Sequence, residues 1–190
     1  DGTWSYRGGS YKAENDEDLW SWWWYLNDNK EMEGHYVDGR KNGIWTWWFD
    51  SGIKQSEGHY IDDEQDGLWS YFSKDGSVAE EITFSGGKRD GRSTVWLTPE
   101  EKQEEKFYRN GKLDGPSTFW ENGYRSTMTT YKSDSPEGPW VIWFSNSDQI
   151  KEQGFHQKGI REGLTTYYYE DGTMQREGFF KEGLPDGMWT

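Results

Sequence analysis

A glycine recurs about every 24 residues through most of the sequence, and this period constrains the fold more than any other feature. The marker glycines are Gly43, Gly67, Gly91, Gly115, Gly138, Gly163 and Gly187, at steps of 24, 24, 24, 23, 25 and 24 residues. An acidic or amide residue stands directly before each marker. A fixed period of this length is typical of proteins in which one supersecondary unit stacks against copies of itself.

Each repeat predicts two β-strands. In the unit from Gly43 to Asp66, residues 45–49 are aromatic-rich and flanked by turn residues, which is typical of a strand. Asp50-Ser51-Gly52 then marks a tight turn, and a second strand is expected from about Lys54 to Ile61. Short loops throughout leave no room for helices, so the pattern indicates an antiparallel meander.

A second periodic position lies four residues before each marker and predicts a left-handed backbone. It is occupied only by Gly or Asp: Gly39, Asp63, Gly87, Gly111, Asp134, Gly159 and Gly183. Glycine adopts positive φ freely, and Asp is among the more tolerant alternatives. This position therefore predicts the turn that leads from one unit into the next.

The repeat accounts for the whole chain as a single array. An abbreviated unit covers residues 1–17, about seven units of roughly 24 residues cover 18–186, and residues 187–190 begin a further unit. The predicted fold class is all-β: an elongated, single-layer antiparallel meander of repeated hairpins, twisted or coiled by the right-handed twist of its strands.

Aromatic residues must supply most of the apolar surface that such a sheet can bury. The chain is poor in aliphatic residues but has 14 Trp, 12 Tyr and 9 Phe among its 190 residues. Each ring can remove roughly 150–250 Å² from water. The composition therefore favours a folded sheet with aromatic layers, in spite of a formal net charge of −14.

A column of rings is the candidate binding site. Three residues after the leading position of each unit stands an aromatic residue: Trp23, Trp48, Phe72, Trp96, Trp120, Trp143 and Tyr168. Strand alternation places this column on the face opposite Trp45, Trp47 and Trp69. Either the column is an exposed platform for a ligand, or both ring columns are structural and cross-strand rings cover Gly34, Gly58 and Gly178.

The sequence offers no catalytic constellation, and the chain is not expected to be an enzyme. Cys is absent and the three His are scattered, so neither a nucleophile with its base nor a metal or cofactor site is predicted. The periodic glutamates are interpreted as a structural column that bonds to neighbouring turns: Glu33, Glu57, Glu81, Glu105, Glu152 and Glu177.

The pattern resembles the MORN repeat, and more specifically the bacterial variant found in YwqK-like antitoxins. The residues that carry the resemblance are Trp45, Trp48, Gly52, Glu57, Tyr60, Asp63 and Gly67, and in the next unit Trp69, Phe72, Gly76, Glu81, Phe84, Gly87 and Gly91. Ser93, Ser117 and Thr165 depart from it at the leading Trp position, and Pro99-Glu100 departs at the first turn, which predicts local irregularity. The resemblance implies stacked hairpins that serve as scaffolds, dimerisation surfaces, lipid contacts or toxin neutralisers.

Two functions stay open at this point. The first is a non-catalytic scaffold or binding module for another protein, with an antitoxin-like or immunity role and a basic partner. The alternative is a cell-surface or periplasmic module that binds a polysaccharide through the Trp column. The acidic balance disfavours nucleic acid and anionic membranes as partners. Self-association through edge strands is a further expectation, and a bacterial cell-surface, periplasmic or secreted location is slightly favoured over the cytoplasm.

Overall fold

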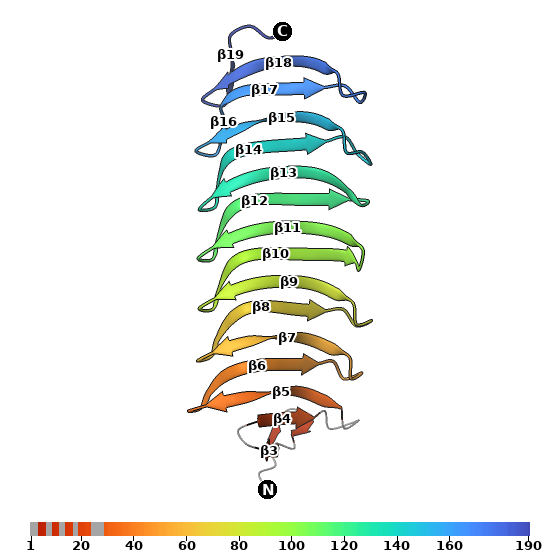
Figure 1. Cartoon of the computed structure of the whole chain (residues 1–190), viewed down its shortest axis with the longest axis vertical. Coiled ribbons are helices and arrows are strands. Elements are labelled where there is room, and N and C mark those ends of the chain that lie inside the picture. The colour runs from red at the N-terminus through yellow and green to blue at the C-terminus, as the bar shows by residue number, and fades with distance from the viewer. Residues whose placement is uncertain (1–3, 7–8, 12–13, 17–18, 24–28) are drawn as a thin grey trace. The chain divides into compact units, whose positions relative to one another are not determined.

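The chain forms two compact units, residues 1–90 and 91–190, which divide at the marker Gly91. The computed structural model describes residues 4–6, 9–11, 14–16, 19–23 and 29–190, with side chains for Ser21 and for residues 29–190. Figure 1 shows the strands in chain order, each beside the next within its unit.

The first unit is a β-meander. Its strands are β1 (Trp4–Tyr6), β2 (Gly9–Tyr11), β3 (Glu14–Asp16), β4 (Leu19–Trp23), β5 (Lys30–Val37), β6 (Arg40–Trp48), β7 (Lys54–Ile61), β8 (Glu64–Phe72) and β9 (Val78–Ser85). Strands β1 and β2 pair with each other, and from β3 to β9 every strand pairs antiparallel with its successor.

The second unit repeats this plan. It contains β10 (Lys88–Thr98, from Gly91 onward in this unit), β11 (Glu101–Arg109), β12 (Lys112–Glu121), β13 (Tyr124–Lys132), β14 (Ser135–Trp143), β15 (Ile150–Gln157), β16 (Ile160–Arg161), β17 (Gly163–Tyr168), β18 (Met174–Lys181) and β19 (Leu184–Asp186). Within this unit each strand pairs antiparallel with the next strand in the sequence, except that β15 pairs with both β16 and β17.

The predicted fold class is confirmed as an all-β antiparallel meander of repeated hairpins. Helices are absent from the described residues, so none of these could cross a membrane as a helix. The predicted second strand from Lys54 to Ile61 matches β7. The expected irregularity near Pro99-Glu100 is also present, because the β10–β11 register shifts twice between Val95 and Thr98.

The periodic Gly and Asp residues have the backbone that their pattern predicts. The position four residues before the marker has φ between 70° and 83°, including 70° at both Asp63 and Asp134. The marker glycines also have positive φ, from 73° to 135°, and lie at the β-bulges where each inter-repeat hairpin shifts register. Left-handed geometry at both ends of the turn explains why so few residue types occupy these positions.

Successive inter-repeat turns are joined by hydrogen bonds. The backbone N–H of Asp63 donates to the carbonyl of Lys41 at 3.0 Å, and its carboxylate accepts the Lys41 N–H at 2.7 Å. Asp134 makes the same two bonds to Leu113, at 2.9 and 2.8 Å. Each turn is therefore tied to the turn one repeat before it as well as to its own strands.

The core lies on the sheet surface instead of between two layers. Trp45 is fully buried, Trp69 is 2% exposed and Trp140 is 3% exposed, although no second sheet or helix covers them among the described residues. Rings of adjacent strands bury one another, as expected from the aromatic-rich composition.

Candidate functional site

The predicted ring column lies near the end of the first strand of each hairpin. Trp48, Phe72, Trp96, Trp120 and Tyr168 are half-buried, and Trp143 is 9% exposed. Trp23 ends β4, but its side chain lies outside the described residues. The described rings of the column are therefore partly covered and not fully exposed.

Cationic side chains of the preceding hairpin cover several of these rings. The distances from cation to ring centroid are 5.8 Å for Lys30 and Trp48, 5.8 Å for Lys54 and Phe72, 5.5 Å for Lys102 and Trp120, and 4.8 Å for Arg125 and Trp143. Cation–π contact of this kind contributes roughly 0.5–1 kcal/mol at exposed sites. Tyr168 instead accepts a hydrogen bond from Gln153 at 2.7 Å.

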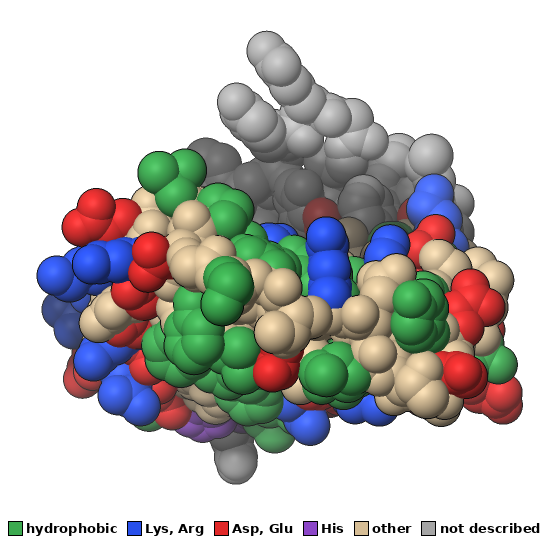
Figure 2. All heavy atoms as spheres, turned by 90° about the horizontal axis from the view of Figure 1, so that it is seen from above, with side chains coloured by type: hydrophobic (Ala, Val, Ile, Leu, Met, Phe, Trp, Pro, Cys, Tyr) green, Lys and Arg blue, Asp and Glu red, His purple; other side chains and the backbone are tan. Residues whose placement is uncertain are grey.

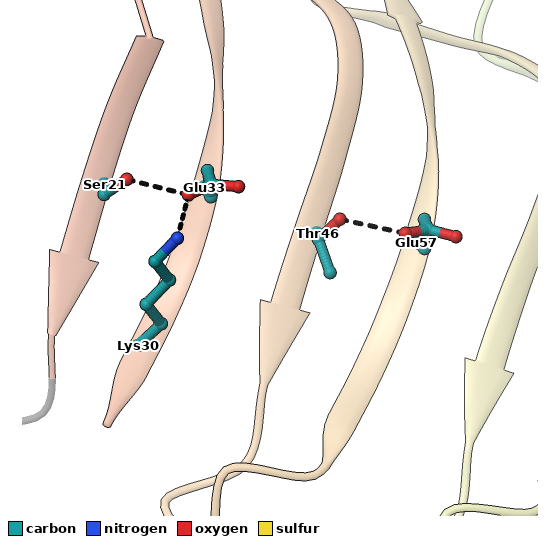
Figure 3. A network of polar contacts seen from close by, with 5 residues as sticks. All are labelled: Ser21, Lys30, Glu33, Thr46 and Glu57. Atoms are coloured by element: carbon teal, nitrogen blue, oxygen red, sulfur yellow. Dashed lines mark hydrogen bonds and ion pairs between the residues drawn. The ribbon is translucent and has the colours of Figure 1, made fainter. Parts of the chain in front are cut away.

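Glutamates next to the column bond to hydroxyl groups across the strands. Ser21 donates to Glu33 at 3.0 Å and Thr46 donates to Glu57 at 3.1 Å (Figure 3). Lys30 forms an ion pair with the same Glu33. Desolvation raises the pKa of Glu33, but the hydrogen bonds from Lys30 and Ser21 outweigh it and leave the pKa lowered overall.

Two details of the predicted glutamate column are wrong. Glu33 and Glu57 bond to side chains within the sheet and not to a neighbouring turn. Glu152 does not stand in the column either, because it pairs with Ile142 while Gln153 takes the equivalent place opposite Val141. The β14–β15 turn is one residue longer than the other hairpin turns, as the bond from Phe144 N–H to the Gln149 carbonyl shows, and this extra residue moves Gln153 into the place of the glutamate.

The opposite face is a stack of Trp and Tyr rings over glycine. A Cβ added to Gly34 would lie 2.1 Å from the Trp45 ring, and one added to Gly58 would lie 2.2 Å from the Trp69 ring. Gly178 is covered in the same way by Trp189. The prediction that cross-strand rings cover these three glycines is therefore confirmed, and the rings belong to the leading Trp positions.

The leading Trp side chains are also held by polar and ring contacts. The indole N–H of Trp45 donates to the carbonyl of His35 at 3.1 Å, and Trp69 repeats this bond with His59. Tyr36 packs edge-on against Trp45, with ring centroids 5.0 Å apart. The repeated contact fixes each ring in one orientation.

Lys41 lies against three rings of this face. Its ammonium is 4.5 Å from the Trp45 centroid, 5.2 Å from that of Trp47 and 5.1 Å from that of Tyr60. Desolvation lowers the pKa of Lys41, and the charge of Asp63 partly opposes that shift. The site is filled by the chain's own cation, so these rings offer no vacant cage.

Trp140 departs from the glycine rule because its neighbour on the preceding strand is Thr129. Its ring lies instead against Gly154, where an added Cβ would meet Trp140 at 2.7 Å and the Thr165 hydroxyl at 2.8 Å. The guanidinium of Arg161 stacks on the same indole at 4.4 Å. Thr165, which replaces the leading Trp of the next unit, leaves the space that Trp140 fills.

A row of exposed apolar side chains crosses the second unit on the face that carries the glutamates. This apolar row consists of Pro139, Phe155, Leu164 and Phe179, and the last three are 45%, 43% and 55% exposed. Sequence reasoning missed it, although a signal exists: Leu164 and Pro139 each directly follow a marker glycine. Figure 2 shows hydrophobic side chains on the surface directly beside acidic and basic ones.

A shallow hollow of about 500 Å³ lies beside the hairpin turns of β14–β15 and β17–β18. It is lined by Phe144, Lys151, Tyr167, Tyr168, Tyr169, Glu170 and Gln175.

The β14–β15 turn closes with a hydrogen bond from the Phe144 N–H to the Gln149 carbonyl, five residues on, whereas the Tyr169 N–H donates to the Thr173 carbonyl, four residues on. The extra residue accounts for the 25-residue step from Gly138 to Gly163.

The comparisons with known proteins identify the repeat. Three segments match the MORN repeat variant. They are residues 41–62, 65–85 and 161–182, which coincide with the hairpins β6–β7, β8–β9 and β17–β18. No curated protein matches the sequence. MORN repeats commonly serve as binding or scaffold modules, and the matches concern the repeat without singling out the antitoxin-like subfamily.

Proposed function

We propose that the chain is a non-catalytic binding module that recognises another protein. The observation that carries this proposal is the contrast between its two kinds of apolar residue. Rings of the two columns lie against the chain's own cations or pack over its glycines, whereas the apolar row stays exposed on a strongly acidic protein. Large exposed apolar groups rimmed by polar residues mark interaction sites.

The environment of the carboxylates supports a binding function over catalysis. Glu33 and Glu57 are engaged with Ser21, Thr46 and the lysines of their own strands. A hydrolase of the two-carboxylate type needs a pair of acids that face each other across a cleft. A row of acids along one sheet face, each bonded to its neighbours, suits a structural role.

The acidic charge favours a basic partner. With a formal net charge of −14, the chain attracts positively charged proteins from a distance, and the attraction weakens as salt screens it. An antitoxin-like role, in which a basic toxin domain is the partner, is the finer form of this proposal. The use of MORN repeats as binding modules supports the coarser form.

The test is retention of proteins from a cell extract on the immobilised chain, followed by binding measurements with the purified partner. We expect one or a few basic proteins to be retained at low ionic strength, with affinity falling at least tenfold between about 50 and 300 mM salt. Absence of any specifically retained protein would contradict the proposal. Turnover of a substrate by the purified chain would also contradict it.

The hollow beside Tyr167 supports a second candidate function, the binding of a neutral saccharide. Its walls combine aromatic rings with Lys151, Glu170 and Gln175, so rings and hydrogen-bonding groups converge there. A panel of soluble glycans should then change the intrinsic fluorescence of the chain, independently of salt. A spectrum left unchanged by every glycan in the panel removes this candidate.

Self-association through edge strands stays a separate prediction, since exposed strand edges can pair with another chain. Light scattering across a hundredfold concentration range tests it. A mass of 22.4 kDa at every concentration would contradict it.

A further inference from the structure

We propose that the apolar row of Pro139, Phe155, Leu164 and Phe179 binds a basic amphipathic helix of the partner. The inference rests on the proposed protein-binding function and deepens it, because it assigns the surface and the chemistry of the segment that docks there. It places binding in the second unit and on side chains that the ring columns do not include.

The strand register brings these four side chains onto one face of the sheet as two opposed pairs. Pro139 is directly opposite Phe155 in the β14–β15 pair, and Leu164 is directly opposite Phe179 in the β17–β18 pair. The β15–β17 pairing has Gln153 opposite Thr166, and beyond a register shift the Phe155 carbonyl accepts the Glu162 N–H. Alternation along each strand still places Phe155 on the face of Gln153 and Leu164 on the face of Thr166. Residues opposite each other in adjacent strands point to the same face, so the row crosses four neighbouring strands.

The row has no role in the packing of the sheet that would explain its residue types. Phe155, Leu164 and Phe179 keep about half of their surface in water. At the equivalent place in the first unit, His59 is exposed opposite Ile44, so a polar residue is tolerated there. Two Phe and a Leu in one exposed line expose apolar area that a partner would bury favourably.

Carboxylates stand directly beside the apolar side chains. Glu162 donates its backbone N–H to the Phe155 carbonyl at 3.0 Å, and Asp186 is the register partner of Phe179. One Glu162 oxygen accepts the Glu182 N–H at 2.8 Å, which holds this carboxylate in place. Lys181 is the nearest cation along β18, two residues beyond Phe179. Acids interleaved with apolar groups complement a segment in which Lys or Arg flanks Leu or Phe.

The spacing of the row fits one face of a helix. Adjacent strands lie about 4.8 Å apart, so four side chains in line span about 14 Å. A helix rises about 1.5 Å per residue, so its i, i+4, i+7 and i+11 side chains follow one face over about 16 Å, which is close to the width of the row. A second copy of the chain is a poor occupant, because its charge of −14 would repel the first.

A synthetic peptide tests the proposal directly. The probe is a 14-residue helical peptide with Leu along one face and Lys elsewhere, and its matched control has Glu in place of Lys. Binding to the full chain is measured by fluorescence anisotropy for wild type, Phe155→Ser/Phe179→Ser and Phe155→Leu/Phe179→Leu. Leu97→Ser serves as the control variant, since Leu97 is 65% exposed but lies outside the row.

We expect the Lys peptide to bind wild type, the double Leu variant and Leu97→Ser with similar affinity, and the double Ser variant at least tenfold more weakly. The Glu peptide should not bind. Equal affinity of wild type and the double Ser variant would overturn the proposal, as would equal binding of both peptides. Binding of wild type but not the double Ser variant to neutral phosphatidylcholine vesicles, without peptide binding, would overturn it in favour of a membrane.

Failure of this proposal is distinguishable from failure of the proposed function. If an extract protein is retained equally by wild type and by Phe155→Ser/Phe179→Ser, the chain binds proteins through another surface and the row is not the site. If wild type retains no protein, the binding function itself fails.

Discussion

At the scale of single residues, stability depends on matched sizes in adjacent strands. Trp45 and Trp69 each lie over a glycine of the preceding strand. In another repeat, Ser117 replaces the leading Trp, and the preceding strand has Lys106 in place of the glycine. A large ring needs a residue without a side chain beneath it, because a close-packed interior has no room for both the ring and a second side chain. The repeats are therefore alike in backbone but not interchangeable in sequence.

Gly58→Ala should destabilise the chain by about 1–3 kcal/mol, since its Cβ would fall 2.2 Å from the Trp69 ring. Urea unfolding of Gly58→Ala, Trp69→Ser and the double variant measures this. Trp69→Ser alone should cost about 3–5 kcal/mol through loss of a buried ring. In the Trp69→Ser background, Gly58→Ala should cost little. An equal cost in both backgrounds would show that the ring does not restrict position 58.

Variants of Asp134 test the left-handed backbone predicted for the turn between repeats. Its φ is 70° and its carboxylate accepts the Leu113 N–H at 2.8 Å. Asp134→Ala loses the bond and keeps a strained backbone, whereas Asp134→Gly loses the bond but relieves the strain. Asp134→Ala should therefore be less stable than Asp134→Gly by about 1 kcal/mol in urea unfolding. The reverse order would contradict the assigned backbone.

At the scale of the hairpin, sequence patterns predicted the elements well and their exact register poorly. The left-handed positions, the β7 boundaries and the covered glycines follow from residue types that few alternatives can replace. The exchange of Glu152 for Gln153 depends on one extra residue in the β14–β15 turn, and the altered position of Trp140 depends on the volume of neighbouring side chains. The 25-residue step from Gly138 to Gly163 signals the first without placing the extra residue, whereas the second arises from tertiary packing, which a repeat period does not encode.

The turns within hairpins contribute acid-sensitive stability. The side-chain hydrogen bond from Ser77 lowers the pKa of Asp75, and that from Thr173 lowers the pKa of Asp171. A carboxyl with a lowered pKa in the folded state stabilises it above the unfolded value of about 3.8, and this contribution is lost as pH falls through the lowered folded pKa.

The unfolding temperature should therefore fall as pH decreases from about 5 to about 2, and less steeply in Asp75→Asn/Asp171→Asn than in wild type. Calorimetry at a series of pH values checks this expectation. A double variant whose unfolding temperature falls as steeply as that of wild type would show that these turns do not carry the acid sensitivity.

At the scale of the whole molecule, we propose that stability and binding depend on different side chains. Each hairpin contacts its immediate neighbours within a unit, so stability is distributed through repeated Trp–Gly, Lys–ring and Glu–hydroxyl contacts. The exposed apolar row is outside this set of contacts. Sequence analysis placed the candidate site on the ring column, because periodicity reveals which rings recur but not which of them the chain's own lysines cover.

The measurement that tests this division most directly compares two variants of the full chain. Trp48→Ser/Trp120→Ser removes two rings of the column, and Phe155→Ser/Phe179→Ser removes two rings of the apolar row. For each variant, the unfolding temperature and the affinity for the basic partner peptide are measured. We predict that the column variant unfolds at a lower temperature but binds normally when folded, and that the row variant unfolds like wild type but binds at least tenfold more weakly. A column variant of unchanged stability that has lost binding would contradict the account.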